Sequence, residues 1–125
     1  MKTKFIIFIV VVVLVIGGFG IYVSITPQKP GKLDTFAKCI ESSGAKFYGA
    51  FWCSHCQNQK ELFGSSEKYL PYIECSTLDG QGVNQVCKDN GIEGYPTWVF
   101  ADESRLSGEL SLITLAGKTQ CVLPQ

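Results

Sequence analysis

The amino-acid sequence predicts an α/β fold in which a mixed β-sheet carries helices on both faces, preceded by an N-terminal transmembrane helix. Three observations lead to this prediction. The uncharged run Phe5–Ile25 is long enough to cross a bilayer as a helix. Residues 33–125 alternate short apolar runs with segments of helical periodicity. All six cysteines fall within those residues, a density typical of small domains that work in oxidising compartments.

The N-terminal segment is interpreted as an uncleaved signal anchor. A cytoplasmic tail of residues 1–4 contains Lys2 and Lys4, and residues 5–25 form the transmembrane segment. A cleaved signal peptide is the alternative, since Gly18-Phe19-Gly20 offers small residues to a peptidase, but the apolar stretch continues beyond them. Because lysines flank the run on both sides, the orientation follows from the cysteines, which require the C-terminal domain to be extracytoplasmic at the cell membrane.

Residues 26–32 (TPQKPGK) form a short stiff linker, and residues 33–125 form one domain. Four of the 11 basic residues of the chain precede residue 33, so 7 basic residues face 11 acidic ones in the domain, a net charge of about −4. This balance excludes a nucleic-acid binder that neutralises phosphates, and it excludes a polybasic membrane-surface module.

The first half of the domain predicts a βαβ unit. An amphipathic helix over 34–43 precedes a buried strand over 45–51. A helix over 53–63, with a further turn over 65–70, leads to a second strand over 72–76. This order requires parallel pairing of the two strands.

The second half predicts a helix, a hairpin and a last helix. The helix over 83–90 ends at Gly91 in a Schellman motif that folds Ile92 back onto the helix. Strands over 97–100 and 105–108 form the hairpin. Ser111 caps the final helix, which runs to Lys118.

The chemistry is expected at the strand-to-helix junction Phe51-Trp52-Cys53-Ser54-His55-Cys56. Free N–H groups and the helix dipole favour the thiolate form of Cys53, and His55 is expected to add a positive charge or a hydrogen bond to that thiolate. Cys56 lies one turn further on and can form a disulfide with Cys53. The pair therefore supplies an attacking and a resolving sulfur, and stabilisation of the reduced form makes the disulfide a stronger oxidant.

The same cysteines allow three other interpretations. A zinc site would need a second close pair, whereas Cys75 and Cys87 are well separated in sequence. A copper-binding assembly factor would use both thiolates of Cys53 and Cys56, although His55 is the chain's 1 histidine. A purely structural bridge over so short a loop would stabilise little. We therefore expect no metal and no cofactor other than the Cys53–Cys56 disulfide.

A second signal is Gly94-Tyr95-Pro96-Thr97, which stands directly before the hairpin. A cis Tyr95–Pro96 bond would turn this loop sharply against the cysteines, and an ordinary trans proline is the alternative.

Together these segments resemble the thioredoxin superfamily over residues 33–125. More narrowly, GAKFYGAFWCSHCQNQKELFG, YLPYIECS and GIEGYPTWVF resemble the thioredoxin-like domain associated with bacterial homologues of vitamin K epoxide reductase. The resemblance implies that Cys53 is the nucleophile, that Cys56 resolves the mixed disulfide, and that Pro96 is a cis-proline. It also implies that Trp52, Tyr95 and Pro96 contact an extended substrate segment, and that electrons from cysteines of exported proteins pass to the membrane reductase homologue.

Two departures from the family pattern bear on the direction of electron flow. Thioredoxins carry a buried acid six positions before the first cysteine, and Phe47 stands there in this chain. Ser54 replaces the usual glycine or proline, and His55 is typical of extracytoplasmic oxidases and isomerases. The sequence therefore favours an oxidant of exported proteins, with a reductase or isomerase fed by a membrane electron donor as the alternative.

The other four cysteines allow three pairings. Cys75 ends a strand and Cys87 lies on the helix that follows a flexible loop, so these two are expected to pair. Cys39 and Cys121 would then tie the first helix to the end of the last one. Two buried free thiols are the alternative to one of these structural disulfides.

Overall fold

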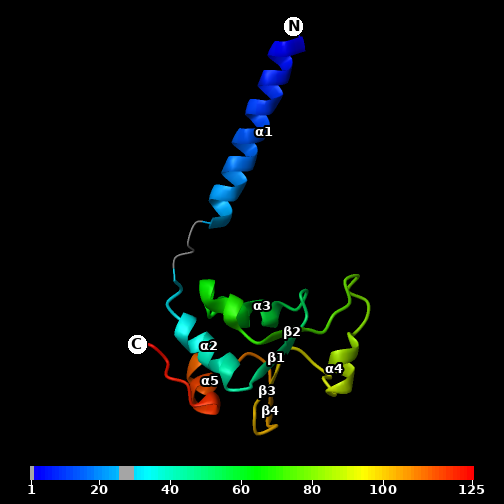
Figure 1. Ribbon diagram of the computed structural model, residues 1–125. Coiled ribbons are helices and arrows are strands. Elements are labelled where there is room, and N and C mark those ends of the chain that lie inside the picture. The colour runs from blue at the N-terminus through cyan, green and yellow to red at the C-terminus, as the bar shows by residue number, and fades with distance from the viewer. Residues whose placement is uncertain (1, 26–29) are drawn as a thin grey trace.

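The computed structural model describes residues 2–25 and 30–125 (Figure 1). The first element is α1 (Lys2–Ile25), on which the predicted anchor falls. Its described apolar side chains, from Ile6 to Ile16, are exposed. Over the described residues, none of the helices has the combination of length and apolar character that crossing a membrane requires. Most of the predicted linker, residues 26–29, lies outside the described residues.

Within the described residues, the sheet has 4 strands in the order β2-β1-β3-β4. The central strand β1 (Lys46–Gly49) is parallel to β2 (Tyr72–Glu74) and antiparallel to β3 (Thr97–Val99), which pairs in turn with β4 (Arg105–Ser107). The predicted mixed sheet, βαβ unit and hairpin are confirmed. The strands are shorter than the apolar runs suggested, because after Gly49 the chain leaves β1 and turns, with the Cys53 N–H donating to the Ala50 carbonyl at 3.0 Å.

The helices of the domain are α2 (Asp34–Ser42), α3 (Ser54–Glu61), the 3₁₀ helix η1 (Gly64–Tyr69), α4 (Gln85–Asp89) and α5 (Leu112–Thr119). The expected start of α4 at Val83 is wrong, because Val83 forms a β-bridge with Ser76 and the Asn84 side chain donates to the Glu74 and Ser76 carbonyls.

Both predicted helix-end motifs are present. Gly91 adopts a positive φ of 61° after α4, and the Ile92 N–H donates to the Cys87 carbonyl at 2.9 Å, which is the Schellman bond. The Ser111 hydroxyl accepts from the Thr114 N–H at 3.0 Å and caps α5.

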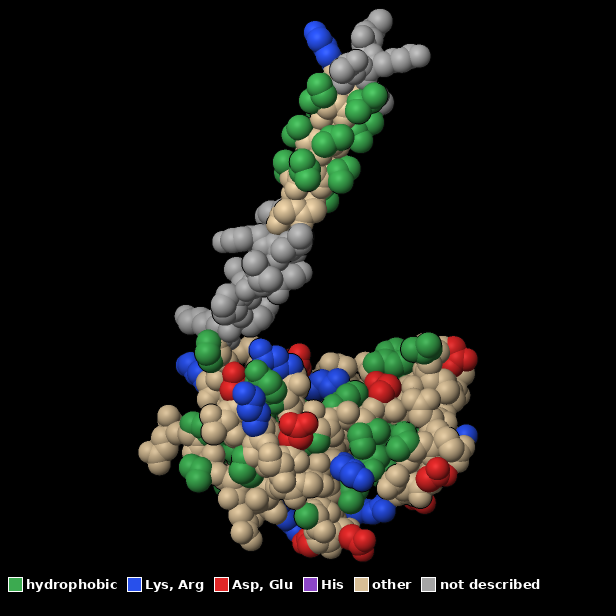
Figure 2. All heavy atoms as spheres, in the orientation of Figure 1, with side chains coloured by type: hydrophobic (Ala, Val, Ile, Leu, Met, Phe, Trp, Pro, Cys, Tyr) green, Lys and Arg blue, Asp and Glu red, His purple; other side chains and the backbone are tan. Residues whose placement is uncertain are grey.

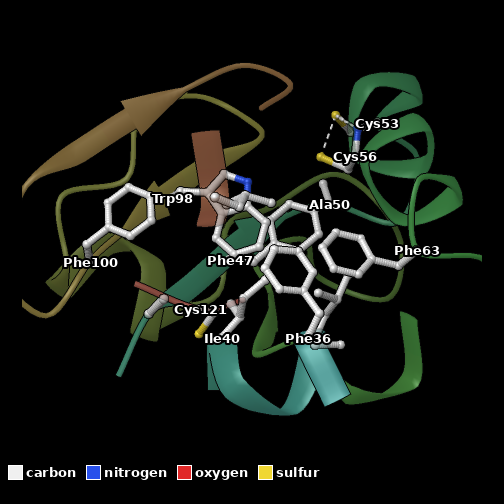
Figure 3. Packing of buried hydrophobic residues seen from close by; sticks show 14 residues of the cluster. Phe36, Ile40, Phe47, Ala50, Cys53, Cys56, Phe63, Trp98, Phe100 and Cys121 are labelled. Carbon is white, nitrogen blue, oxygen red and sulfur yellow. Dashed lines mark hydrogen bonds between the residues drawn. The ribbon is translucent and has the colours of Figure 1, made fainter. Parts of the chain in front are cut away.

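The side chains of β1 alternate between two hydrophobic clusters, one on each face of the sheet. Phe47 stacks on Trp98 with ring centroids 4.7 Å apart, and this cluster takes side chains from α2, α3 and α5 (Figure 3). Tyr48 points to the other face, where it packs with Cys75, Cys87 and Ile92 beside α4. Helices therefore cover both faces, as predicted. The first and last helices of the domain share one face and pack against each other.

Two disulfides join the elements. Cys39 of α2 is bonded to Cys121, which lies just beyond α5, and Cys75 at the end of β2 is bonded to Cys87 of α4. These are the two pairings that the sequence favoured. Cys53 and Cys56 are free thiols.

Candidate active site

Cys53 is the N-cap residue of α3. Its backbone is extended, with φ −80° and ψ 113°, and its sulfur accepts the Cys56 N–H at 3.2 Å. A thiol in this position replaces the oxygen that usually caps a helix, so a first-turn N–H of α3 points at the sulfur. The predicted placement of Cys53 at the start of the helix is therefore confirmed.

Cys56 lies directly behind Cys53, and the two sulfurs are 2.6 Å apart (Figure 3). Cys53 is 7% exposed, whereas Cys56 is fully buried at 0%. Burial, reinforced by the hydrogen bond with Cys53, raises the pKa of Cys56 to about 12. Cys56 is therefore a neutral thiol near neutral pH, and Cys53 is the sulfur that a second protein can reach.

His55 bonds to Glu109 and not to Cys53, so of its two expected contributions the hydrogen bond to the thiolate is absent, and the contribution of its charge stays a prediction. Its Nδ1 atom lies 2.6 Å from Oε1 of Glu109, and the side chain is 68% exposed. The Asn58 amide donates to the same oxygen at 3.0 Å. A carboxylate attracts the imidazole more strongly than a thiol does. The hydrogen bond from His55, followed by that from Asn58, lowers the pKa of Glu109 below its usual range.

The segment that contains Glu109 also anchors the buried side of α3. The Gln59 side chain is fully buried, donates to the Leu110 carbonyl at 3.0 Å and accepts the Leu110 N–H at 2.6 Å. Residues 109–110 therefore form hydrogen bonds with three side chains of α3, those of His55, Asn58 and Gln59. Sequence reasoning missed Gln59 and Glu109, which are 51 and 54 positions from their partners Leu110 and His55.

The loop before β3 places the segment Gly94-Tyr95-Pro96-Thr97 near the cysteines, as the lining of a shared groove shows. The Tyr95–Pro96 peptide bond is cis, as predicted. Trp52 and Tyr95 meet edge to face with ring centroids 6.0 Å apart. A surface groove is lined by residues from both segments: Trp52, Cys53, Ser54, His55, Glu93, Gly94 and Tyr95.

The carboxylate of Glu74 holds the backbone of the junction Phe51–Cys56 in place. Glu74 accepts the Phe51 N–H at 3.2 Å, the Ser76 N–H at 2.8 Å and the Tyr72 hydroxyl at 2.8 Å. The Trp52 indole N–H donates to the Ser76 hydroxyl at 2.9 Å. The end of β2 thus fixes the backbone and the aromatic side chain that precede Cys53.

Comparisons with known proteins agree with this geometry. The thioredoxin family model matches residues 34–116. The chain is 48% identical over 93 residues to the "Thiol-disulfide oxidoreductase LTO1" of Arabidopsis thaliana, which covers 71% of this chain and 24% of that protein. It is 34% identical over 91 residues to the "Thioredoxin domain-containing protein 5 homolog" of Drosophila melanogaster, covering 66% of this chain and 22% of that protein.

The chain thus spans about a quarter of the length of the curated relatives it matches. The match to the family model extends from the first helix of the domain into its last one and includes the Cys53–Cys56 junction and the cis-proline loop. The chain belongs to the thioredoxin family.

Proposed function

We propose that this protein is a membrane-anchored, extracytoplasmic oxidant that forms disulfides in exported proteins. The observation that carries the proposal is the asymmetry of the cysteine pair, in which Cys53 is reachable from the groove and Cys56 is buried behind it. The two further disulfides support an oxidising compartment, because such bonds are rare in the reducing cytosol.

The reaction begins with the Cys53–Cys56 disulfide. A substrate thiolate attacks the Cys53 sulfur, the Cys53–Cys56 bond breaks, and Cys56 leaves as a thiolate that takes up a proton. A second substrate thiolate then attacks the substrate sulfur of the mixed disulfide and releases Cys53. The substrate gains a disulfide, and the enzyme gains two electrons as its reduced thiol pair.

The groove beside Cys53 is the proposed binding site for the substrate segment. Trp52 and Tyr95 form its aromatic walls, and Gly94 and Tyr95 of the loop before Pro96 line it beside Cys53. An extended segment with a cysteine opposite Cys53 would lie between these walls.

The uncharged run on α1 supports the proposed anchor. The exposed side chains Ile6–Ile16 are aliphatic or aromatic (Figure 2), and a run of this character favours hydrocarbon over water. An anchor would hold the domain beside a membrane redox partner. From the resemblance of its cysteine and proline segments, we propose a homologue of vitamin K epoxide reductase as the acceptor of the electrons.

A trapping experiment in cells tests the proposal. In the Cys56→Ser variant of the full chain, the Cys53 thiolate can attack the disulfides of exported proteins, which is the reverse of the proposed exchange. The variant should accumulate the resulting mixed disulfides, because no Cys56 is present to release Cys53. The Cys53→Ser variant is the matched control and should trap none. Equal trapping by both variants would contradict the assigned roles.

The direction of electron flow needs a second measurement. An oxidant should carry the Cys53–Cys56 pair mainly as a disulfide in cells, and its equilibrium with glutathione should favour the reduced enzyme. A pair that is mainly reduced in cells would instead support the reductase or isomerase fed by a membrane donor. Copper that copurifies with the untreated chain in stoichiometric amount would support the assembly-factor alternative.

A further inference from the structure

Lys60 lies one helical turn after Cys56, on the same face of α3. Its Nζ atom stands 3.5 Å from the centroid of the Tyr72 ring, which is the closest of the cation–π contacts in the described part of the chain. Such a contact holds an ammonium group in place over the ring face. A positive charge is therefore fixed beside the buried resolving cysteine.

The ring of Tyr72 also lies next to the Cys56 sulfur, because Gly49 leaves room for both. A Cβ atom at Gly49 would stand 2.7 Å from Cε2 of Tyr72 and 3.0 Å from the sulfur of Cys56. The ring also contacts Phe47 edge to face, with ring centroids 5.2 Å apart. The Tyr72 hydroxyl donates to Glu74, and this bond fixes the orientation of the ring.

The groups that face Cys56 differ in charge. Cys53 is the N-cap of α3 and Lys60 lies on α3. Tyr72 comes from β2 and Tyr95 from the cis-proline loop, and Glu74 of β2 accepts the hydrogen bond of the Tyr72 hydroxyl. Burial and the neighbouring carboxylate raise the pKa of Tyr72 above its ordinary value, so the phenol stays neutral. Among these groups, Lys60 supplies the positive charge and Glu74 the negative charge.

Cys56 needs that positive charge during exchange. It is fully buried, and burial opposes formation of its thiolate. The apolar Phe47 occupies the position at which the family carries a buried acid, so no carboxylate there can take the proton. Two groups act in the opposite sense to burial and lower the pKa of Cys56: a hydrogen bond with the Ala50 backbone and, after it, the charge of Lys60.

We propose that Lys60, held over the ring of Tyr72 by a cation–π contact, stabilises the Cys56 thiolate that forms when the Cys53–Cys56 disulfide opens. Lys60 is a positioning residue in the sense that it acts through its charge and forms no bond with the substrate. The proposal rests on the proposed function, since it assigns a role within the same exchange reaction.

In this step one sulfur–sulfur bond forms and another breaks. A thiolate attacks the Cys53 sulfur, a new sulfur–sulfur bond forms, the Cys53–Cys56 bond breaks, and its electron pair stays on Cys56. Solvent then protonates Cys56. In the reverse direction Cys56 loses a proton to solvent and attacks Cys53 as a thiolate. Lys60 stabilises the charged species between these end states and neither end state itself, so it accelerates both directions equally.

The experiment measures opening and closing rates of the disulfide in the full chain. Reduced and oxidised glutathione are the reagents, and the fluorescence of Trp52 and Trp98 is the readout. Lys60→Met should slow opening and closing by the same factor, roughly twofold or more, and leave the equilibrium with glutathione unchanged. Lys60→Arg should restore both rates, because it keeps the charge over the ring.

Two further variants separate charge from packing. Lys38→Met removes a similar cation–π contact, in which Nζ lies 4.3 Å from the Tyr69 ring, and should leave the rates unchanged. Tyr72→Leu removes the ring that holds Lys60, so it should slow opening and closing of the disulfide as Lys60→Met does. Tyr72→Phe keeps the ring face and should retain most of both rates.

The proposal is overturned by wild-type rates in Lys60→Met, by equal slowing in Lys60→Arg, or by a change in the equilibrium alone. These outcomes are independent of the trapping test. A Cys56→Ser variant that traps no exported protein would refute the proposed function, while the glutathione rates of the chain with both cysteines would still report on Lys60.

Discussion

The Nδ1 atom of His55 lies 2.6 Å from Oε1 of Glu109 and joins the first turn of α3 to the segment that follows β4. His55, which was expected to add either a charge or a hydrogen bond to the Cys53 thiolate, forms its hydrogen bond with a carboxylate. Its charge is therefore linked to Glu109, and any effect on Cys53 acts across space and not through a hydrogen bond.

Replacing His55 should raise the pKa of Glu109 toward its ordinary value of 4.5, because the hydrogen bond from His55 is the largest cause of its lowering. A carboxyl group whose pKa is lowered by folding adds stability above the ordinary value, and that stability is lost as the pH falls through the lowered value. Side-chain carboxyl titration by NMR in wild type and His55→Ala measures the shift. An identical titration in both proteins would contradict the pair.

His55→Ala should also make the Cys53–Cys56 disulfide less oxidising. A positive imidazole near the helix start favours the reduced form, and its loss removes that contribution. Because the side chain is exposed and already paired, we expect a change of about 20 mV or less, measured against glutathione. Asn58→Ala removes the other bond to Glu109 without changing charge, so it should leave the potential unaltered. An unchanged potential in His55→Ala would leave this residue without a tuning role.

Cys53 should react before Cys56 when the reduced protein is alkylated at mildly acidic pH. Cys53 is reachable from the groove, whereas Cys56 is fully buried and its pKa is raised to about 12. Mass mapping of the alkylated peptides reads the order directly, and the Cys53→Ser variant serves as the control for slow labelling of Cys56. Preferential labelling of Cys56 in the wild type would reverse the assignment of attacking and resolving sulfurs.

The sequence predicted those parts of the site that lie close together along the chain. Trp52, Cys53 and Cys56 share one junction, and the turn signal at Pro96 marks a single loop. Periodicity and capping residues also located the helices and strands of the domain, with errors at their ends where a turn or a β-bridge replaced regular structure, as at Ala50 and Val83.

The remaining site residues join distant segments, and no local pattern marks them. Glu109 and Glu74 are ordinary charged residues in sequence, and their roles arise only because β4 and β2 end beside α3. The pairing of α2 with α5 on one face likewise depends on how the helices pack, which periodicity does not determine. The cysteines alone gave a sequence signal for that contact.

The two structural disulfides should differ in their contribution to stability. The Cys39–Cys121 bond spans 82 positions and the Cys75–Cys87 bond spans 12. In the loop-entropy model these contribute about 4.5 and about 3 kcal/mol to the free energy of unfolding. Urea unfolding of the paired Cys→Ala variants measures both, with the wild type as reference. A larger loss on removing Cys75–Cys87 would show that the loop-entropy model does not describe this domain.

Gly49→Ala should impair both stability and exchange, because the added methyl group has no space. Its Cβ atom would stand 2.7 Å from Tyr72 and 3.0 Å from the Cys56 sulfur, so the ring or the sulfur must move. Overpacking of this kind costs about 1–3 kcal/mol, and displacement of Cys56 should slow closure of the Cys53–Cys56 disulfide. Gly117→Ala in α5 is the matched control, since nothing lies within 4 Å of its Cβ position and alanine favours a helix by up to about 1 kcal/mol. Denaturant unfolding and the rate of disulfide closure are the two measurements. A Gly49→Ala variant as stable and as fast as the Gly117→Ala control would show that Cys56 and Tyr72 are not packed against this glycine.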